Sequence, residues 1–107
     1  MKNLPFLLTP VGKDYLWGGD RLNDDFNLNI NVTPLAEAWM CSCHPDGESL
    51  VDGVSLTELL KAHSEWLGTH ASEVARGDFP ILVKLIDAKS DLSIQVHPDD
   101  DYAIENE

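Results

Sequence analysis

The alternation of apolar and polar positions along the chain predicts short strands separated by turns. Phe6–Thr9 is an apolar run that a proline closes, and it is expected to form an opening strand. Leu35–His44 alternates with a period near two and ends at turn residues, which is typical of a strand. A short helix is expected at Asp20–Phe26. Asn27–Thr33 alternates polar and apolar residues, but this pattern does not decide which secondary structure the segment forms.

Ser55 begins the most distinct helical pattern in the sequence. Ser55 and Glu58 form a capping box, in which the hydroxyl and the carboxylate each satisfy a free backbone N–H at the start of a helix. The residues of one helix face then recur at helical spacing, namely Leu56, Leu59, Leu60, His63, Trp66 and Leu67. Gly68 can adopt the left-handed backbone conformation that ends a helix. The pattern predicts one helix from Ser55 to Gly68 that covers the sheet.

Two strand-like runs late in the sequence predict a hairpin. Ile81–Asp87 and Leu92–His97 are joined by a short polar connection. Because side chains alternate between the two faces of a strand, the second run has an apolar face and a polar face. The apolar face carries Leu92, Ile94 and Val96, and the polar face carries Ser93, Gln95 and His97. After Pro98, three aspartates are expected to begin a helix, whose positive end they favour.

Composition and charge exclude several classes of partner. The chain has 107 residues, 43% of them hydrophobic and 24% charged, as in one ordinary globular domain. Nineteen acidic residues against seven scattered basic ones give a net charge of −12, so no basic patch is present to bind nucleic acid or an anionic membrane. No apolar run approaches the roughly 20 residues that span a bilayer, and no secretory signal is recognisable, so a cytoplasmic location is expected.

Gln95 and His97 are candidate metal ligands. On one face of a strand their side chains begin about 6–7 Å apart, so both can reach one ion. An imidazole and an amide oxygen suit a borderline divalent metal such as zinc. Catalytic zinc generally takes three protein ligands, however, so the pair alone also fits a half-exposed polar strand face.

Lys84 and the cysteines carry the remaining candidate chemistry. A lysine within an apolar run is costly to bury unless its ammonium meets an anion or reaches solvent. Lys84 is therefore either a ligand contact or an edge-strand residue that discourages aggregation. Cys41, Cys43 and His44 offer soft metal ligands, but cysteines are more often core residues. With no third cysteine, a disulfide framework is excluded and reduced thiols are expected.

Two longer runs and three shorter motifs carry a resemblance to a known family. The runs are Phe79–Ala88 and Asp91–Asp100, and the second contains a specific Gln-x-His-Pro pattern. The motifs, which occur in the same order as in the family, are Leu16-Trp17-Gly18-Gly19, Ala36-Glu37-Ala38-Trp39 with His44-Pro45, and Gly47-Glu48-Ser49. Together they resemble the type I mannose-6-phosphate isomerases, particularly the short bacterial form, over essentially the whole chain.

The resemblance implies a zinc enzyme of cupin architecture that interconverts mannose 6-phosphate and fructose 6-phosphate. It implies that His97 is a zinc ligand and that Gln95 matches a ligand position used less uniformly. Lys84 and Ser93 match positions near the substrate, where Lys84 contacts the sugar phosphate or serves a catalytic proton path. Family members are considerably longer. The other zinc ligands, a glutamate and a second histidine, and the catalytic arginine are therefore expected beyond Glu107, and no catalytic residue is assigned within the chain.

The expected fold is mainly β with a covering helix. Residues 1–107 are expected to form a single incomplete cupin-like domain, the N-terminal portion of a cupin-type (double-stranded β-helix) barrel. The expected function is that of a zinc-dependent aldose–ketose isomerase, here as an N-terminal fragment that is inactive alone. A non-catalytic cupin-like module that binds a metal or a sugar is one alternative, and an acidic fragment without activity is another. Exposed strand edges of an unfinished barrel predict a homodimer.

Overall fold

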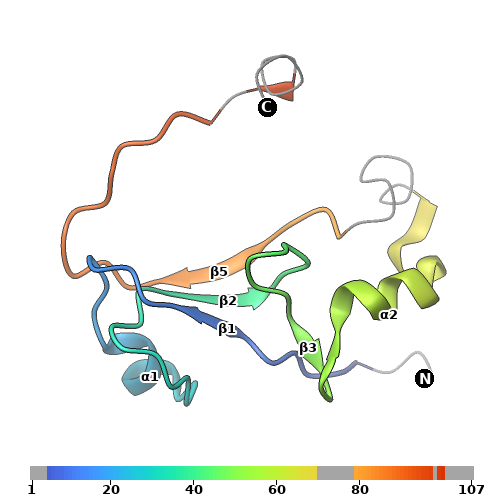
Figure 1. The fold of residues 1–107 in the computed structure, drawn as a ribbon, viewed down its shortest axis with the longest axis horizontal. Coiled ribbons are helices and arrows are strands. Elements are labelled where there is room, and N and C mark those ends of the chain that lie inside the picture. The colour runs from blue at the N-terminus through green and yellow to red at the C-terminus, as the bar shows by residue number, and fades with distance from the viewer. Residues whose placement is uncertain (1–4, 70–78, 98, 101–107) are drawn as a thin grey trace.

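The computed structural model, which describes residues 5–69, 79–97 and 99–100, is built around a small antiparallel sheet. Three strands lie in the order β1-β2-β5 (Figure 1). They are β1 (Val11–Lys13), β2 (Glu37–Cys41) and β5 (Val83–Ile86). The predicted strand at Leu35–His44 is thus confirmed in its central part, and it is the middle strand of the sheet.

The register divides the sheet into two chemically different faces. On one face, two rows of residues run across the three strands. The first row is Val11, Trp39 and Lys84, and the second is Lys13, Glu37 and Ile86. The opposite face carries Ala38 and Leu85. Ala38 joins a core cluster with Leu22 and Leu35, against which Leu28, Ile30, Val32, Met40 and Leu85 pack. The sheet therefore buries one face and leaves the other for polar groups.

The helix α1 (Arg21–Phe26) confirms the short helix predicted after Asp20. The Asp87 carboxylate accepts the backbone N–H of Arg21 at 2.8 Å and so satisfies one free donor at the helix start. Asn27 ends the helix with a φ of 53°. The following residues form no strand, because the Asn23 amide bonds both the N–H and the carbonyl of Ile30, at 2.9 and 2.8 Å, and holds them in a loop.

The predicted helix from Ser55 to Gly68 is two elements. The helix α2 (Leu56–Ala62) begins as predicted, with the Ser55 hydroxyl accepting the N–H of Glu58 at 3.1 Å. The chain leaves the α-helix at His63 and continues as the 3-10 helix η1 (Ser64–Leu67). This tighter winding brings the His63 and Trp66 rings into a stack with centroids 4.1 Å apart.

The helix α2 packs on a hairpin and does not lie across the sheet. The hairpin comprises β3 (Leu50–Val51) and β4 (Val54–Ser55), and its Asp52-Gly53 turn has positive φ at both positions, as a type I′ turn requires. Val51, Leu56 and Leu60 form the second core cluster. Figure 1 shows α1 and α2 at opposite ends of the sheet, so the expectation of a helix covering the sheet is corrected.

The opening strand predicted at Phe6–Thr9 is wrong. Thr9 makes only an isolated bridge to Leu50, and the first strand begins after Pro10. Proline has no backbone N–H to contribute to a ladder, so the sheet starts one residue later, at Val11. None of the helices in the described part of the chain is long and apolar enough to cross a membrane.

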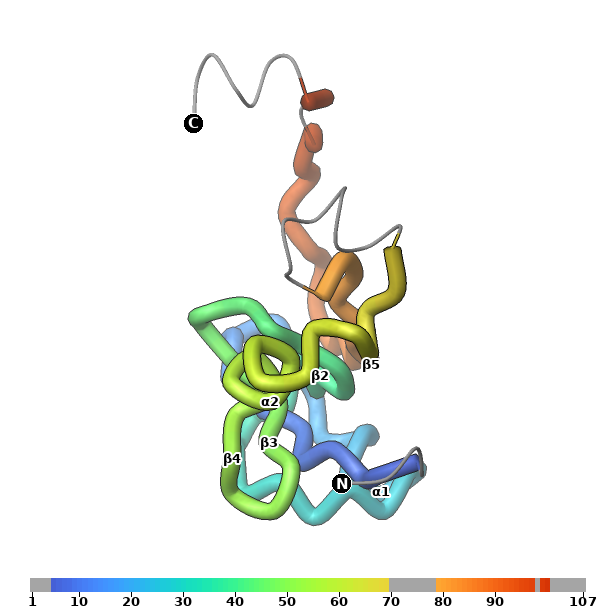
Figure 2. Tube along the Cα trace, turned by 90° about the vertical axis from the view of Figure 1, so that its right-hand side faces the viewer, coloured from blue at the N-terminus to red at the C-terminus, as the bar shows by residue number. Residues whose placement is uncertain are grey.

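The hairpin predicted between Ile81–Asp87 and Leu92–His97 is also wrong. Only Val83–Ile86 is a strand, and residues 92–97 run extended away from the sheet without strand pairing (Figures 1 and 2). Ile94 is 99% exposed and Val96 is 91% exposed. Among the described residues, the outer edge of β5 has no strand beside it, so the barrel is not closed. The helix expected after Pro98 lies almost wholly outside the described residues.

Candidate functional site

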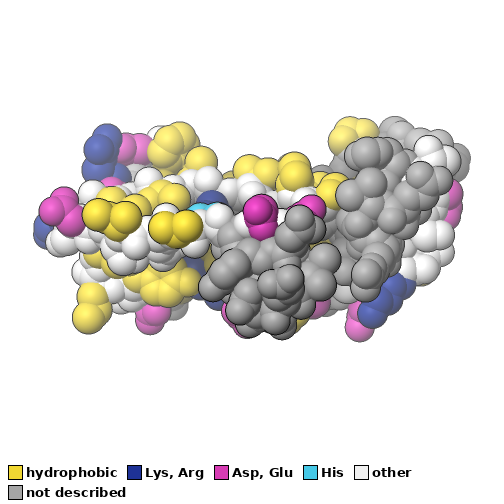
Figure 3. All heavy atoms as spheres, turned by 90° about the horizontal axis from the view of Figure 1, so that it is seen from above, with side chains coloured by type: hydrophobic (Ala, Val, Ile, Leu, Met, Phe, Trp, Pro, Cys, Tyr) yellow, Lys and Arg dark blue, Asp and Glu magenta, His cyan; other side chains and the backbone are white. Residues whose placement is uncertain are grey.

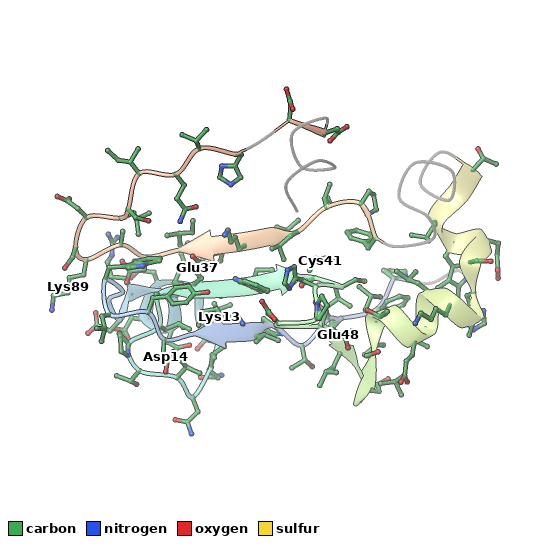
Figure 4. All side chains as sticks on the ribbon, turned by 45° about the horizontal axis from the view of Figure 1, so that its top comes forward. Lys13, Asp14, Glu37, Cys41, Glu48 and Lys89 are labelled. Atoms are coloured by element: carbon green, nitrogen blue, oxygen red, sulfur yellow. The ribbon has the colours of Figure 1, made fainter. Side chains whose placement is uncertain are left out.

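Glu37 is a buried carboxylate on the polar face of the sheet. It is 7% exposed. Its Oε1 accepts the indole N–H of Trp39 at 2.9 Å and lies 3.3 Å from Nζ of Lys84. Glu37, labelled in Figure 4, lines a cavity together with Leu92, Ser93 and Gln95 of the extended segment. A buried carboxylate is costly without hydrogen-bonding partners, and these two donors stabilise it where it lies.

Lys84 combines the two interpretations that the sequence left open. It lies on β5, an edge strand among the described residues, directly opposite Trp39 in the register. Its ammonium also meets an anion, the carboxylate of Glu37, while its side chain stays 38% exposed. An ammonium has three N–H donors, so the pair with Glu37 leaves donors free for a ligand.

A cavity of about 160 Å³ brings the predicted substrate residues together. It is lined by Trp17, Glu37, Lys84, Ile86, Leu92, Ser93 and Gln95. The Gln95 amide donates to the Ser93 hydroxyl at 3.2 Å. Lys84, Ser93 and Gln95 therefore share one cavity. His97, the other predicted ligand, is exposed and is not part of its lining.

Backbone hydrogen bonds position the wall of this cavity. The carbonyl of Trp17 accepts the N–H groups of Lys89 and Ser90 at 2.8 and 3.0 Å. The turn after β5 is thus fixed to the Trp17 loop, and Leu92, Ser93 and Gln95, which follow this turn, line the cavity together with Lys84. A Cβ at Gly18 would lie 2.4 Å from Cα of Ala36, so only glycine permits this close approach.

The residues present match a zinc site in type but not in number. Gln95 and His97 supply an amide oxygen and an imidazole. No group of three or more His, Cys, Asp or Glu side chains that would hold a metal occurs in residues 5–69, 79–97 and 99–100. The roles of Gln95 and His97 as metal ligands therefore remain predictions from the sequence.

Cys41 and Cys43 are core residues, as the sequence favoured. Both are free thiols that pack against the cluster of Val51, Leu56 and Leu60. Burial raises the pKa of the Cys41 thiol above its ordinary value of 9.0, and the negative charge of an ionised Cys43 raises it further. A protonated thiol is a poor nucleophile and a poor metal ligand, so Cys41 has a packing role.

A larger cavity of about 550 Å³ lies at the other end of the sheet. Its lining comes from the loop after β2, from α2 and from the residues before β5, and consists of Cys43, His44, Pro45, Glu48, Thr57, Lys61, Phe79, Pro80, Ile81 and Leu82. It contains none of the predicted site residues. The smaller cavity at Glu37 is therefore the candidate functional site.

Sequence reasoning gave no role to Trp17 or Glu37, although both lie in quoted motifs. The sequence did contain a signal for Glu37. Residues two apart on a strand lie on the same face, so the Glu37 carboxylate is expected next to the Trp39 indole. Trp17 gave a weaker signal, because its place in the cavity depends on the contact with the turn after β5.

Comparison with known proteins identifies the family. Residues 6–106 match the family described as phosphomannose isomerase type I, catalytic domain. The chain belongs to this family, which confirms the resemblance seen in the sequence. It is 45% identical to YvyI of Bacillus subtilis (strain 168), with 100% of this chain and 34% of that protein covered. It is 43% identical to the mannose-6-phosphate isomerase of Streptococcus mutans, with 96% and 33% covered.

A solved structure supports the same assignment. The crystal structure of the mannose 6-phosphate isomerase from Bacillus subtilis matches with a TM-score of 0.83 and 45% sequence identity. The match covers 95% of this chain and 33% of that chain. The chain thus spans about a third of the length of the relatives it matches.

Proposed function

We propose that this chain supplies part of the active site of a zinc-dependent aldose–ketose isomerase that interconverts mannose 6-phosphate and fructose 6-phosphate. The observation that carries the proposal is the gathering of Lys84, Ser93 and Gln95 around one cavity beside Trp17 and Glu37. Membership of the phosphomannose isomerase family supplies the reaction and the substrate class.

The side chains around the cavity suit a polar ligand that changes charge as it reacts. Moving a proton between C1 and C2 of a sugar needs a group that carries the proton and donors that stabilise the developing negative oxygen. Lys84, Ser93 and Gln95 all offer N–H or O–H donors there. A bound zinc would polarise the sugar carbonyl, and His97 with Gln95 are the residues of this chain that would hold it.

The incomplete sheet supports an architecture that is completed by further strands. We propose that residues 1–107 form a single incomplete cupin-like domain, whose sheet is the N-terminal portion of a double-stranded β-helix barrel. On this proposal the chain acts in the cytoplasm, is inactive alone and dimerises through free strand edges. The unaccompanied outer edge of β5 within the described residues supports the last two statements.

A non-catalytic module that binds a metal or a sugar is the second candidate. The observation that favours it is the pair of metal donors, Gln95 and His97, without a third in the described part of the chain. Turnover distinguishes the two candidates, because both predict binding and only the isomerase predicts catalysis.

The isomerase proposal is tested with the chain alone and in a chimera. The purified 107-residue chain, loaded with zinc, is expected to show no turnover in a coupled assay, because two ligands hold zinc weakly. A chimera of residues 1–107 with the remaining two thirds of the Streptococcus mutans enzyme is expected to isomerise mannose 6-phosphate. A folded chimera that binds the sugar phosphate without turnover supports the binding module.

Variants of the chimera assign the roles of individual residues. Lys84→Met is expected to lower kcat/KM by about 100-fold or more, as loss of a positioned proton-transfer or charge-stabilising group does. Lys89→Met, on the turn after β5, is the matched control and is expected to leave kcat/KM unchanged.

His97→Ala is expected to lower the zinc content, measured by elemental analysis, more than Gln95→Ala does, because water can replace an amide ligand. Equal metal loss contradicts this order.

A further inference from the structure

We propose that Glu37 determines which part of a ligand Lys84 can bind. Its carboxylate cancels the charge of the ammonium and fixes its direction, so that Lys84 donates to an uncharged hydroxyl or carbonyl oxygen and not to a phosphate. For the sugar phosphate this inference rests on the proposed function, and it requires the phosphate to be bound away from Lys84. The charge argument itself rests only on contacts within this chain.

The Glu37 carboxylate is held beside Lys84 by its contact with Trp39. Its Oε1 accepts a hydrogen bond from the Trp39 indole and forms an ion pair with the Lys84 ammonium, whose Nζ lies 3.3 Å away. Trp39 is itself 7% exposed, and the Lys13 ammonium lies 4.2 Å from the centre of its ring. A buried indole packed beneath a cation has little freedom to move, so it keeps the carboxylate oriented. Figure 4 shows Lys13 and Glu37 on the neighbouring strands β1 and β2.

The charges around the cavity sum to zero. Among its lining residues Lys84 is the cation and Glu37 the anion, whereas Trp17, Ser93 and Gln95 are uncharged. A phosphate bound to Nζ of Lys84 would also lie within a few ångströms of the Glu37 oxygens, where repulsion between like charges offsets most of the attraction. The net charge of −12 on the whole chain opposes an anion further.

A neutral ligand oxygen meets none of this repulsion. The ammonium has three N–H donors, and its ion pair with Glu37 leaves donors free for a neutral oxygen. The Ser93 hydroxyl and the Gln95 amide line the same cavity and both bind hydroxyl groups readily. The uncharged hydroxyl end of a sugar phosphate therefore matches this site better than its phosphate does.

The test is a gain of phosphate binding in Glu37→Gln. The amide oxygen of glutamine still accepts the Trp39 N–H, so the variant removes the charge and keeps the packing. Titration of the 107-residue chain with inorganic phosphate at low salt is followed by NMR at the Ser93 amide and the Trp39 indole. Glu37→Gln is expected to bind phosphate about fivefold more tightly than the wild type, with a gain that shrinks as salt is added.

Two further variants make the result specific. Glu48→Gln also removes one negative charge, but Glu48 lines the larger cavity at the other end of the sheet, so no gain is expected (Figure 4). Glu37→Gln combined with Lys84→Met is expected to lose the gain, because the freed ammonium is gone. An equal gain in Glu48→Gln, or a gain that survives loss of Lys84, overturns the inference.

The wild type provides a measurement that does not depend on the folding of Glu37→Gln. Because Glu37 already cancels the charge of Lys84 and the whole chain carries −12, the weak phosphate binding of the wild type is expected not to fall as salt is added. A marked loss of wild-type phosphate binding on addition of salt contradicts the inference. None of these titrations measures isomerase activity. An inactive chimera would therefore contradict the proposed function and leave the inference about Glu37 standing, whereas an unexpected phosphate titration would contradict only the inference about Glu37.

Discussion

The chemistry of Cys41 depends on its place at the end of β2. The thiol is partly buried against apolar side chains, and Cys43 is two residues away on the same cluster. Both effects disfavour the thiolate, and burial is the larger. We expect iodoacetamide to alkylate Cys41 roughly threefold more slowly, or slower still, at pH 8 in the folded chain than in urea, as followed by peptide mass spectrometry.

The control for this prediction is Cys43→Ser, which removes the second negative charge and is expected to speed alkylation of Cys41 in the folded chain. Equal rates for Cys41 in the folded and urea-unfolded chains contradict the raised pKa of Cys41.

The raised pKa of Cys41 also predicts how the stability of the fold changes with pH. Its contribution is fully present below pH 9.0, the unfolded value, and is lost as pH rises through the folded pKa. Above pH 9.0 the free energy of unfolding, measured in urea, is therefore expected to fall more steeply with pH in the wild type than in Cys41→Ser.

Single residues differ in how far their roles can be inferred from the sequence. Lys84 is conspicuous because a charge inside an apolar run needs a local explanation. Glu37 is not, because its pairing with Lys84 depends on the register between β2 and β5, two strands far apart in the sequence. Ser93 and Gln95 were correctly expected to share one side of the chain, because alternation follows from an extended backbone with or without a neighbouring strand.

The helix α2 provides a test at the scale of one element. The Ser55 hydroxyl accepts the N–H of Glu58 at 3.1 Å, so Ser55→Ala leaves that donor unsatisfied. We expect the free energy of unfolding to fall by about 1 kcal/mol, measured by urea unfolding and circular dichroism. Ser64→Ala is the matched control, because Ser64 begins η1, which has no side-chain cap, and a change near zero is expected. Equal losses in the two variants contradict a capping role.

Elements defined by local signals were predicted better than elements that need a distant partner. The start of α2 follows from Ser55 and Glu58, and α1 follows from a short local pattern. The change from α-helix to 3-10 helix at His63, which brings the His63 and Trp66 rings together, is not visible in the helical periodicity. Residues 92–97 have the alternation of a strand, but a strand also needs a neighbour, and the described residues supply none.

At the scale of the whole molecule the described chain is thin and open. Its extents are 40 × 39 × 17 Å, and the radius of gyration is 15.9 Å, above the value of about 13 Å expected for a compact domain of this length. Figure 3 shows apolar side chains at the surface on the side of the extended segment. Exposed apolar side chains on a thin, open chain favour contact with another protein surface.

The open edge predicts that identical chains associate. The outer edge of β5 presents N–H and C=O groups without a strand beside them in the described structure. Ile94 and Val96, on the extended segment that follows β5, are almost fully exposed. Pairing of two such edges buries both sets of groups, and exchange between identical chains is a low-cost route to a dimer. Repulsion from the net charge of −12 is screened beyond about 8–10 Å at physiological salt, so it weakens this contact without preventing it.

Sedimentation velocity at micromolar concentration measures this association. The wild type is expected to sediment as a dimer, and Ile94→Lys is expected to shift it toward the monomer, because a charge then enters the apolar contact. Leu16→Lys adds the same charge at a side chain that is 95% exposed but lies outside the strands, so the dimer is expected to persist. A folded wild-type monomer would mean that the chain covers its own edges, and equal dissociation in both variants would place the contact elsewhere than at the β5 edge.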